Sequence, residues 1–378
     1  MTIYQKSLDQ HKKYQGKISM ISKVPLNNKE DLATYYSPGV AEPCRAIYQN
    51  PQLSKTYTSK ANTIAVISDW SAVLWLGNIG GLASLPVMEW KAILFKQFAD
   101  INAIPICLST QDPDEIIATV RAIAPTFWWI NLEDIGAPNC FYVEEKLQDQ
   151  IDIPVFHDDQ HGTAIVLLAW LINACKLTNR KLTDTKVIIQ WAWAWGIAVA
   201  KLLNAYGVKS IYIFDSKWIL YRGRAAMNSY KEEVAKYNIE NFKWDIDKAC
   251  KGSDIFVGLS WQKDSITPEN IKQMTKDPII FATSNPDPEI NPDQAKKAWA
   301  WIIATWRSDY ENQVNNVLAF PWIFKWLLDN GITNITMKHK LAASEAIASM
   351  GQYKKEAIIP DAFWVWIADI VANAVKNA

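Results

Sequence analysis

Residues 187–200 read VIIQWAWAWGIAVA, and this stretch decides which fold the second half of the chain adopts. Its first four residues are apolar and mostly β-branched, which predicts a buried strand, and the residues from Gly196 onward predict a helix. A strand that enters a helix through a tight turn is where dinucleotide-binding folds place their glycines. Here the turn carries three tryptophans instead, Trp191, Trp193 and Trp195.

Glycine in place of two of these tryptophans would make the turn a dinucleotide-binding fingerprint. With glycine at 191 and 193 it reads GAGAxG and ends on Gly196. Asp215 follows about 20 residues later, at the end of the next predicted strand, where an acid binds the adenine ribose hydroxyls. An indole at the first two positions would fill the phosphate site. We therefore assign Trp191, Trp193, Gly196 and Asp215 to coenzyme binding, with native glycine at the first two.

The composition of the whole chain points the same way. Tryptophan occurs 19 times and glycine only 14 times in 378 residues, against a usual glycine share of roughly 7%. One explanation is a tryptophan-rich core, but tandem tryptophans at turns beside Asp and Asn are poor core design. The explanation we favour is a misread UGA codon, which encodes tryptophan in one variant genetic code and glycine in another. An engineered Gly→Trp set is the other option.

If the tryptophans are real, two consequences are expected. Coenzyme binding at 191–195 would be blocked, and packing around Trp128 and Trp129 would fail.

Length, charge and cysteine usage limit the class of protein. The chain is long enough for two cores, and its 39 basic and 39 acidic residues create no field that would attract nucleic acid or a membrane. The first residues contain no apolar core, so we expect no signal peptide. The most apolar stretch, 163–175, is too short to span a membrane and predicts a buried helix. Five scattered cysteines suit a reducing compartment. We expect a cytoplasmic protein that binds neither nucleic acid nor membranes.

Strand-like and helix-like segments alternate along most of the chain, which predicts an α/β fold with parallel sheets. The helix-like segments include 89–100, 114–125 and 141–150, and the tail contains two more, at 336–350 and 363–375. We expect an N-terminal α/β domain at 1–157 and a Rossmann-type, doubly wound domain at 158–378. The predicted strands are 63–69, 104–110, 129–134, 153–159, 185–190, 209–215, 253–260, 278–284 and 301–306.

Acidic residues gather at the ends of two predicted strands. WINLED ends in Glu133 and Asp134, and PVFHDDQHG contains Asp158 and Asp159 between two histidines. Such a carboxylate cluster needs a cation to relieve its repulsion, and oxygen ligands suit Mg²⁺ or Mn²⁺. A His-x-x-x-His zinc pair is the alternative, although the glutamate of a HExxH motif is missing. Helix capping or solvation would explain one aspartate but not the cluster.

Several segments along the chain carry a family resemblance: YYSPGVAEPCRAI (35–47), residues 68–108, INLEDI, PVFHDDQHGTAIV, the turn at 191–196, SNPDPEI (284–290) and RSDYENQVNNVLAFP. In this order they resemble the small bacterial malic enzymes, over roughly residues 32 to 360. That family oxidatively decarboxylates L-malate to pyruvate and CO₂ with NAD⁺ or NADP⁺ and a divalent metal, and the resemblance implies the same fold, activity and cofactors here. It also implies a homodimer, with Tyr36 reaching the partner's site.

The resemblance also assigns roles to individual residues. Lys91 matches the base that removes the hydroxyl proton of malate, Tyr36 matches the acid that protonates C3, and Asp158 matches the group that orients Lys91. Lys91 can act near neutral pH only if burial and the nearby cation lower its pKa. The metal ligands would be Glu133, Asp134 and Asp159; the substrate carboxylate would be held by Asn285 and Asn316, with Asn285 also near the coenzyme.

Several questions stay open at this stage. Asp215 favours NAD, but the neighbouring Lys217 could offset its repulsion of a 2′-phosphate. Glu311 stands where the family usually has proline. Another NAD(P)-dependent α/β dehydrogenase, an inactive malic-enzyme relative and a non-catalytic binding protein with exposed indoles are the alternatives.

Overall fold

Two parallel sheets form the centre of the molecule. The computed structural model describes residues 2–73, 77–260, 262–284, 287–307, 309–314, 316–330, 332, 334–351, 354–355, 357–358 and 367–376. The first sheet has the order β2-β1-β3-β4 and the second the order β6-β5-β7-β8-β9, with every neighbouring pair parallel. The strands are β1 (Thr63–Ser68), β2 (Asn102–Cys107), β3 (Trp129–Leu132), β4 (Val155–His157), β5 (Lys186–Gln190), β6 (Ser210–Phe214), β7 (Ile255–Gly258), β8 (Ile279–Ala282) and β9 (Ile302–Ala304).

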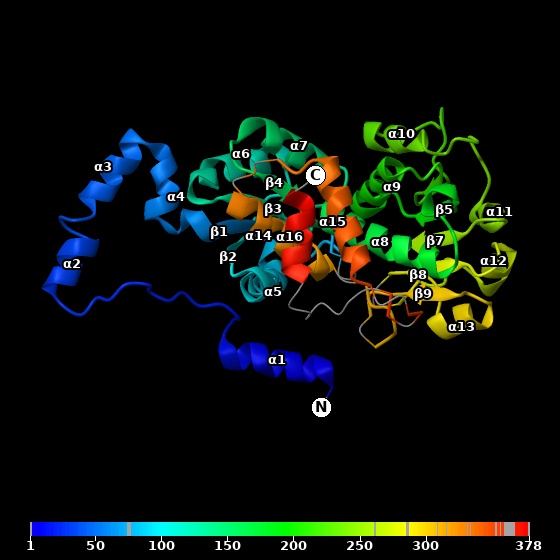
Figure 1. Cartoon of the computed structure of the whole chain (residues 1–378), viewed down its shortest axis with the longest axis horizontal. Coiled ribbons are helices and arrows are strands. Elements are labelled where there is room, and N and C mark those ends of the chain that lie inside the picture. Colours follow the sequence, from blue (N-terminus) through cyan, green and yellow to red (C-terminus); the bar gives the residue numbers. More distant parts are fainter. Residues whose placement is uncertain are drawn as a thin grey trace.

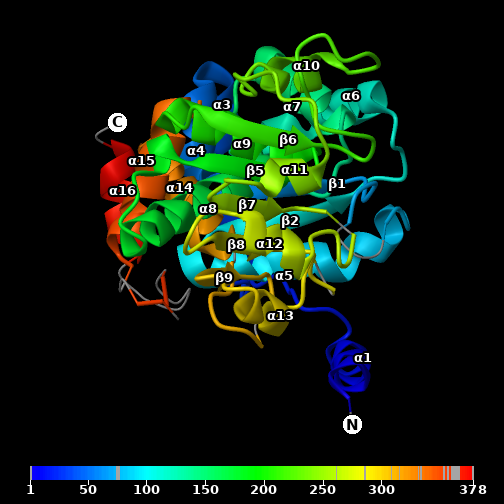
Figure 2. The ribbon, with the colours of Figure 1, turned by 90° about the vertical axis from the view of Figure 1, so that its right-hand side faces the viewer.

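All nine strands lie within or overlap the predicted segments, and the α/β class is confirmed. Figure 2 views the molecule from the side of the second sheet, whose strands follow one another from β6 to β9. The strands are almost fully buried apart from β2, because helices cover the sheets and leave little room for polar residues.

Helices connect the strands and cover the sheets (Figure 1). The predicted apolar helix lies within α8, which is buried at every position from 162 to 175 and packs against α9 and α15. The helices that follow the N-terminal arm are α5 (Gly81–Ala99), α6 (Pro113–Ile123), α7 (Asn139–Gln150), α8 (Asp158–Leu177), α9 (Ala194–Tyr206), α10 (Ser229–Ala235), α11 (Ile246–Cys250), α12 (Pro268–Gln273), α13 (Pro292–Lys297), α14 (Phe320–Asn330), α15 (Met337–Ser349) and α16 (Ile367–Lys376). Single turns of 3₁₀ helix are η1 (Pro51–Leu53), η2 (Ser59–Asn62), η3 (Ala124–Thr126), η4 (Leu182–Asp184) and η5 (Asn316–Leu318).

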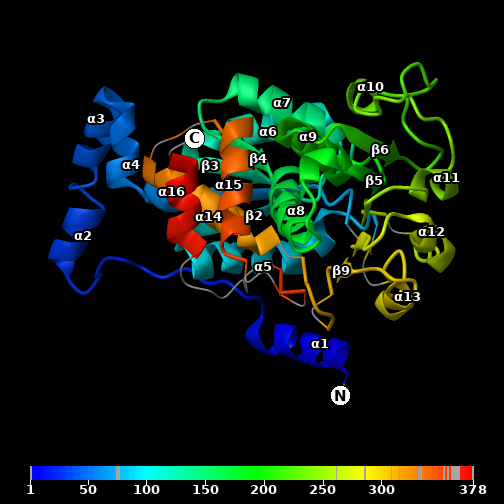
Figure 3. The ribbon, with the colours of Figure 1, turned by 45° about the vertical axis from the view of Figure 1, so that its right-hand side comes forward.

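The N-terminal arm stands apart from this body. It comprises α1 (Ile3–Tyr14), α2 (Lys29–Tyr35), α3 (Ala41–Gln49) and α4 (Ser54–Tyr57). None of these helices contains a buried residue, and Figures 1 and 3 show α2 and α3 at one end of the molecule, away from β3 and β4.

The C-terminal part of the chain returns to the first sheet. Phe324 on α14 packs against Phe95 on α5 at 5.0 Å and against Trp129 on β3 at 4.5 Å between ring centroids. α14, which belongs to the predicted C-terminal domain by its place in the sequence, therefore packs against the predicted N-terminal domain. The domain boundary at 157/158 stays a prediction.

Three tryptophans have backbone conformations that favour glycine. Their φ angles are +51° at Trp70, +97° at Trp191 and +73° at Trp299. Positive φ in a bulky residue is an outlier that costs on the order of 1–3 kcal/mol. Positive φ at these three positions is expected if the native residue there is glycine.

The rings at Trp128 and Trp129 are accommodated, contrary to the expected packing failure. Trp129 is fully buried, and Lys55 lies over the half-buried Trp128 ring, 3.4 Å from its centroid. Their indole N–H groups are nevertheless buried without an acceptor among the described residues, as are those of Trp170, Trp191, Trp306, Trp322 and Trp326. A buried donor without a partner costs about 1–3 kcal/mol, so these sites tolerate tryptophan at a penalty.

Among the described residues, we find no helix with the length and apolarity that crossing a bilayer requires.

Candidate active site

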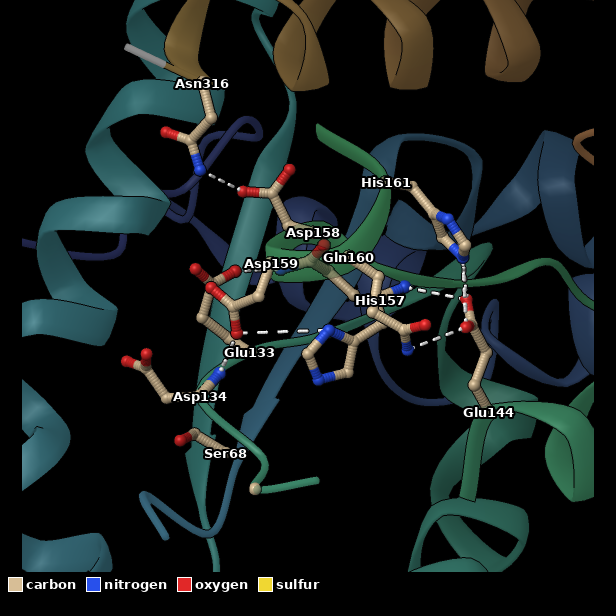
Figure 4. Close-up of polar contacts among 12 residues, drawn as sticks. Ser68, Glu133, Asp134, Glu144, His157, Asp158, Asp159, Gln160, His161 and Asn316 are labelled. Atoms are coloured by element: carbon tan, nitrogen blue, oxygen red, sulfur yellow. Dashed lines mark hydrogen bonds and ion pairs between the residues drawn. The ribbon is translucent and has the colours of Figure 1, made fainter. Parts of the chain in front are cut away.

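The carboxylate cluster forms where two neighbouring strands end. β3 pairs with β4 in parallel, with Leu132 opposite His157, so the residues that follow each strand meet at one edge of the sheet. Glu133 and Asp134 come from the first strand end, and Asp158 and Asp159 open α8 after the second. The backbone N–H of Asp134 donates to Asp159 Oδ2 at 2.7 Å (Figure 4).

Lys91 joins this cluster from α5. Its Nζ lies 2.8 Å from Glu133 Oε1 and 2.8 Å from Asp158 Oδ2, and all three side chains are buried. The structure therefore brings the predicted base into contact with the residue expected to orient it. The sequence predicted a lowered pKa for Lys91 on condition that a cation lies nearby. The chain's own groups act the other way: burial lowers the pKa of Lys91, but the charges of Asp158 and Glu133 outweigh burial and raise it above its ordinary value.

Asp158 is held from two further sides. Asn316, in η5, donates its Nδ2 to Asp158 Oδ2 at 2.7 Å, which occupies part of the amide that we assigned to the substrate carboxylate. Gly162 lies one turn further along α8, and a Cβ there would come within 2.0 Å of Asp158 Oδ1. Glycine at 162 therefore makes room for the aspartate.

The acids repel one another. Burial and the charge of Glu133 raise the pKa of Asp134 to about 8, and burial raises that of Asp158 to about 7 against the opposing effect of Lys91. Burial, Glu133 and Asp134 raise the pKa of Asp159 well above its ordinary value. Three buried carboxylates that resist ionisation together are the donor set a hard divalent cation stabilises.

The arrangement of these acids reflects competing contacts. Within the part of the chain that the structure describes, no three His, Cys, Asp or Glu side chains converge as a ready metal site. The indole of Trp70 donates from Nε1 to Asp134 Oδ2 at 3.0 Å, and Lys91 holds Glu133. The donor chemistry at Glu133, Asp134 and Asp159 thus fits Mg²⁺ or Mn²⁺, while the Trp70 contact engages one oxygen that a cation needs.

The predicted coenzyme turn has the expected backbone path. β5 runs through Trp191 and Trp193 into α9, and Trp193 is the N-cap residue of that helix, with no side-chain cap. A Cβ at Gly196 would lie 2.1 Å from the Trp191 carbonyl oxygen, so this third position requires glycine. The pocket beside the turn is lined by Ala72, Ile135, Ala137, Asp159, Trp191, Trp193, Ala194, Trp195, Gly196 and Leu259.

That pocket joins the turn to the carboxylate cluster. It contains both Asp159 and the indoles of the turn, and the Trp191 and Trp193 rings lie 5.9 Å apart between centroids. A coenzyme with its pyrophosphate at the N-terminus of α9 would extend toward Asp159, but the indoles line the space it would use.

Asp215 lies directly after β6, as predicted, but its carboxylate is engaged within the chain. Arg224 donates to both of its oxygens, at 3.1 Å and 2.5 Å, and Lys231 Nζ donates to Oδ2 at 2.7 Å. The backbone N–H groups of Lys217 and Trp218 donate to Oδ1. Despite partial burial, these donors hold the pKa of Asp215 well below its usual range. A ribose hydroxyl would have to displace one of them, so Asp215 as a ribose ligand stays a prediction.

One predicted site residue, Tyr36, is not brought together with the cluster. Tyr36 follows α2 and is 68% exposed, in the arm that stands away from β3 and β4. Asn285 lies outside the described residues.

Sequence reasoning missed several buried polar neighbours. Asn131 on β3 donates to Glu133 Oε2 at 2.9 Å, and Glu144 on α7 contacts the turn that carries Asp158 and Asp159. Asn131 stands within INLEDI as the one polar residue of a buried strand, which could have marked it, whereas Glu144 stands in none of the quoted motifs.

Comparison with known proteins gives a consistent result. The family profile "Malic enzyme, N-terminal domain" matches residues 15–148, and "Malic enzyme, NAD binding domain" matches residues 160–363. The bifunctional malic/malolactic enzyme of Bacillus subtilis is 48% identical, covering 100% of this chain and 93% of its own. The NADP-dependent malic enzyme of Escherichia coli is 45% identical over 95% of this chain and 48% of its own. The crystal structure of the NAD-dependent malic enzyme of Thermotoga maritima superposes with a TM-score of 0.94 at 45% identity, over 98% of both chains.

Proposed function

The chain belongs to the malic enzyme family, and we propose that it converts L-malate to pyruvate and CO₂ while reducing NAD⁺ or NADP⁺, with Mg²⁺ or Mn²⁺. The observation that carries the proposal is the contact of Lys91 with Glu133 and Asp158 beside Asp134 and Asp159. A buried lysine among hard oxygen donors can remove the proton of the substrate hydroxyl once a bound cation offsets the carboxylate charges that raise the lysine pKa.

Each residue has a step in this proposal. When bound, the divalent cation would polarise the C2 oxygen of malate, and the coenzyme would supply the hydride acceptor. Lys91 takes the proton of the C2 hydroxyl, and Asp158 keeps its Nζ in place through the 2.8 Å contact. Glu133, Asp134 and Asp159 hold the cation, Asn316 and Asn285 bind the substrate carboxylate, and Tyr36 delivers a proton to C3 after CO₂ has left.

The position of the arm supports a homodimer in which Tyr36 acts in the partner's site. α2 lies away from the carboxylate cluster of its own chain, so within one chain the acid and the base are separated. The arm also exposes apolar side chains that a second copy would cover, which is typical of a subunit interface. Those exposed by more than half include Ile3, Tyr4, Leu8, Tyr14, Met20, Ile21, Leu26, Tyr36 and Tyr48.

Mixing two inactive variants tests this arrangement. Tyr36→Phe and Lys91→Met protein, unfolded together and refolded at equal amounts, form hybrid dimers. If the acid acts in trans, each hybrid holds one intact site, and about a quarter of native activity returns. If Tyr36 acts within its own chain, both sites of every hybrid carry one defect and no activity returns.

The reaction itself is tested with protein isolated from its natural source. Malate-dependent formation of NADH or NADPH and pyruvate, abolished by EDTA and restored by Mn²⁺, is expected. A metal-independent oxidation would favour another α/β dehydrogenase. The absence of any malate oxidation would favour an inactive relative, for which the contacts of Trp70 and the indoles of the coenzyme turn are the specific observations.

We place this activity in the cytoplasm. The structure contains five cysteines, all unpaired and three of them buried, as a reducing compartment favours. The balanced charge gives no reason for a nucleic-acid or membrane partner.

A further inference from the structure

A second buried polar cluster lies behind the carboxylates, and none of its members is assigned to the reaction. Glu144 on α7 accepts the backbone N–H of His157 at 3.0 Å through Oε1 and Gln160 Nε2 at 3.1 Å through Oε2. His161 Nε2 lies 2.9 Å and 3.0 Å from the two carboxylate oxygens of Glu144. Figure 4 shows Glu144 on the opposite side of the His157–His161 turn from Asn316.

The cluster continues to the C-terminal part of the chain. Lys340 on α15 places Nζ 2.9 Å from His161 Nδ1. An ammonium group can only donate, so Nδ1 of His161 accepts and its proton is on Nε2, directed at Glu144. The hydrogen bonds therefore run in one direction, from Lys340 through His161 to Glu144.

The charge of Glu144 is maintained where burial alone would suppress it. Burial raises the pKa of this carboxyl, but His161 and Lys340 outweigh burial and bring it down to about 2. An ionised carboxylate accepts hydrogen bonds more strongly than a neutral one, so the bond to the His157 N–H is a charge-assisted one.

That bond fixes the junction between β4 and α8, called here the His157–His161 turn, which carries Asp158 and Asp159. His157 is the last residue of β4, and the next two residues are Asp158 and Asp159. The buried ring of His157 has no hydrogen-bond partner among the described residues, and its Nδ1 lies 3.9 Å from Asp159 Oδ2 (Figure 4). The turn is thus held from behind by Glu144, while Lys91 and Asn316 contact Asp158 in front.

We propose that Glu144, His161 and Lys340 form a positioning relay that sets the direction of Asp158 and Asp159. This rests on the proposed function, in which Asp159 binds the cation and Asp158 orients the base. The relay touches neither substrate nor reacting atoms, so its members are positioning residues. It also makes cation binding depend on α15, whose Lys340 lies 179 residues after His161 in the chain.

Substitution of Lys340 tests the relay without unfolding the site. Lys340→Met keeps the length of the side chain and removes the donor, and Lys338→Met, on the exposed side of the same helix, is the matched control. Lys340→Arg, the conservative variant, keeps a cationic donor. Mn²⁺ binding is measured by electron paramagnetic resonance with the metal alone, without malate or coenzyme.

Lys340→Met and Glu144→Gln are expected to weaken Mn²⁺ binding about tenfold, because loss of an outer partner of a metal ligand typically costs about 10–100-fold in affinity. Lys340→Arg and Lys338→Met should bind Mn²⁺ like the native chain. Native Mn²⁺ affinity in both Lys340→Met and Glu144→Gln would overturn the relay.

Amide hydrogen exchange in EDTA gives a second readout that requires neither metal nor activity. The amide of His157 should exchange at least tenfold faster in Lys340→Met than in Lys338→Met, with unchanged melting temperatures. Protein that shows this difference but no Mn²⁺ binding supports the relay and contradicts the proposed function. Equal exchange in the two variants would overturn the relay, whatever the metal result.

Discussion

Replacing Trp191 and Trp193 by glycine is expected to create coenzyme binding. In the structure the two indoles line the pocket between α9 and Asp159, at the place where a pyrophosphate would meet the N-terminus of the helix. Removing both rings lets a phosphate approach the backbone N–H groups of the first turn. Two charge-assisted hydrogen bonds at about 1.5–3 kcal/mol each amount to about 3–6 kcal/mol. That range corresponds to about 10²–10⁴-fold in Kd.

The same double change should leave the stability of the fold nearly unaltered. Glycine relieves the positive φ of +97° at Trp191, worth about 1–3 kcal/mol, and removes its unpartnered indole N–H. The change also removes two half-buried apolar rings. Full burial of such a ring would stabilise the fold by about 1.5–3 kcal/mol, so each half-buried ring contributes less than this. The opposing effects are of similar size, so the free energy of unfolding should change by less than about 2 kcal/mol.

Fluorescence titration with NADH and NADPH measures the binding. The control is Trp299→Gly, which removes another tryptophan with positive φ, 71% exposed and outside the coenzyme pocket. The control should bind coenzyme as weakly as the parent chain. Micromolar binding by the parent, or no gain in the double variant when its melting temperature is normal, would refute the assignment of this turn.

Three further predictions concern Trp70, His157 and the identity of residues 191 and 193. Trp70→Gly should tighten Mn²⁺ binding at least tenfold, because it frees Asp134 Oδ2 from the indole N–H, and unchanged affinity by electron paramagnetic resonance would contradict this. Burial lowers the pKa of His157 to about 4 from 6.5, so the unfolded chain takes up a proton first and stability rises with pH between about 4 and 6.5. The free energy of unfolding in urea, measured in EDTA, should therefore fall by up to about 3 kcal/mol between pH 7 and pH 4 through this group. His157→Gln should remove this loss, and the control His11→Gln, at a half-buried position on α1, should not. Finally, the tryptic peptide of residues 187–201 from naturally expressed protein should have the mass of a peptide with glycine at 191 and 193; the mass of the tryptophan form would rule out misread codons.

The sequence by itself determined the α/β fold and the chemistry of the cluster. Parallel strands buried on both faces must be continuous apolar runs, so the segments 63–69 and 185–190 were visible without any long-range information. The acids after WINL and PVFH were visible for the same reason, since parallel strands end at a common edge. The turn at 191–196 showed both its backbone role and the mismatch of its side chains with that role.

Only the tertiary structure decided which polar groups contact the carboxylates of those acids. Lys91, Asn316 and Trp70 come from segments far apart in the chain, and their contacts depend on how the helices and loops pack, which no local pattern encodes. No local pattern in the sequence gives Asp215 a partner, whereas in the fold its carboxylate forms ion pairs with Arg224 and Lys231. The relay through Lys340 likewise exists because α15 packs against α8. Periodicity fixes which face of an element is buried, whereas the partner of a buried polar group is chosen by the whole fold, because such a group must find a donor or acceptor wherever packing places one.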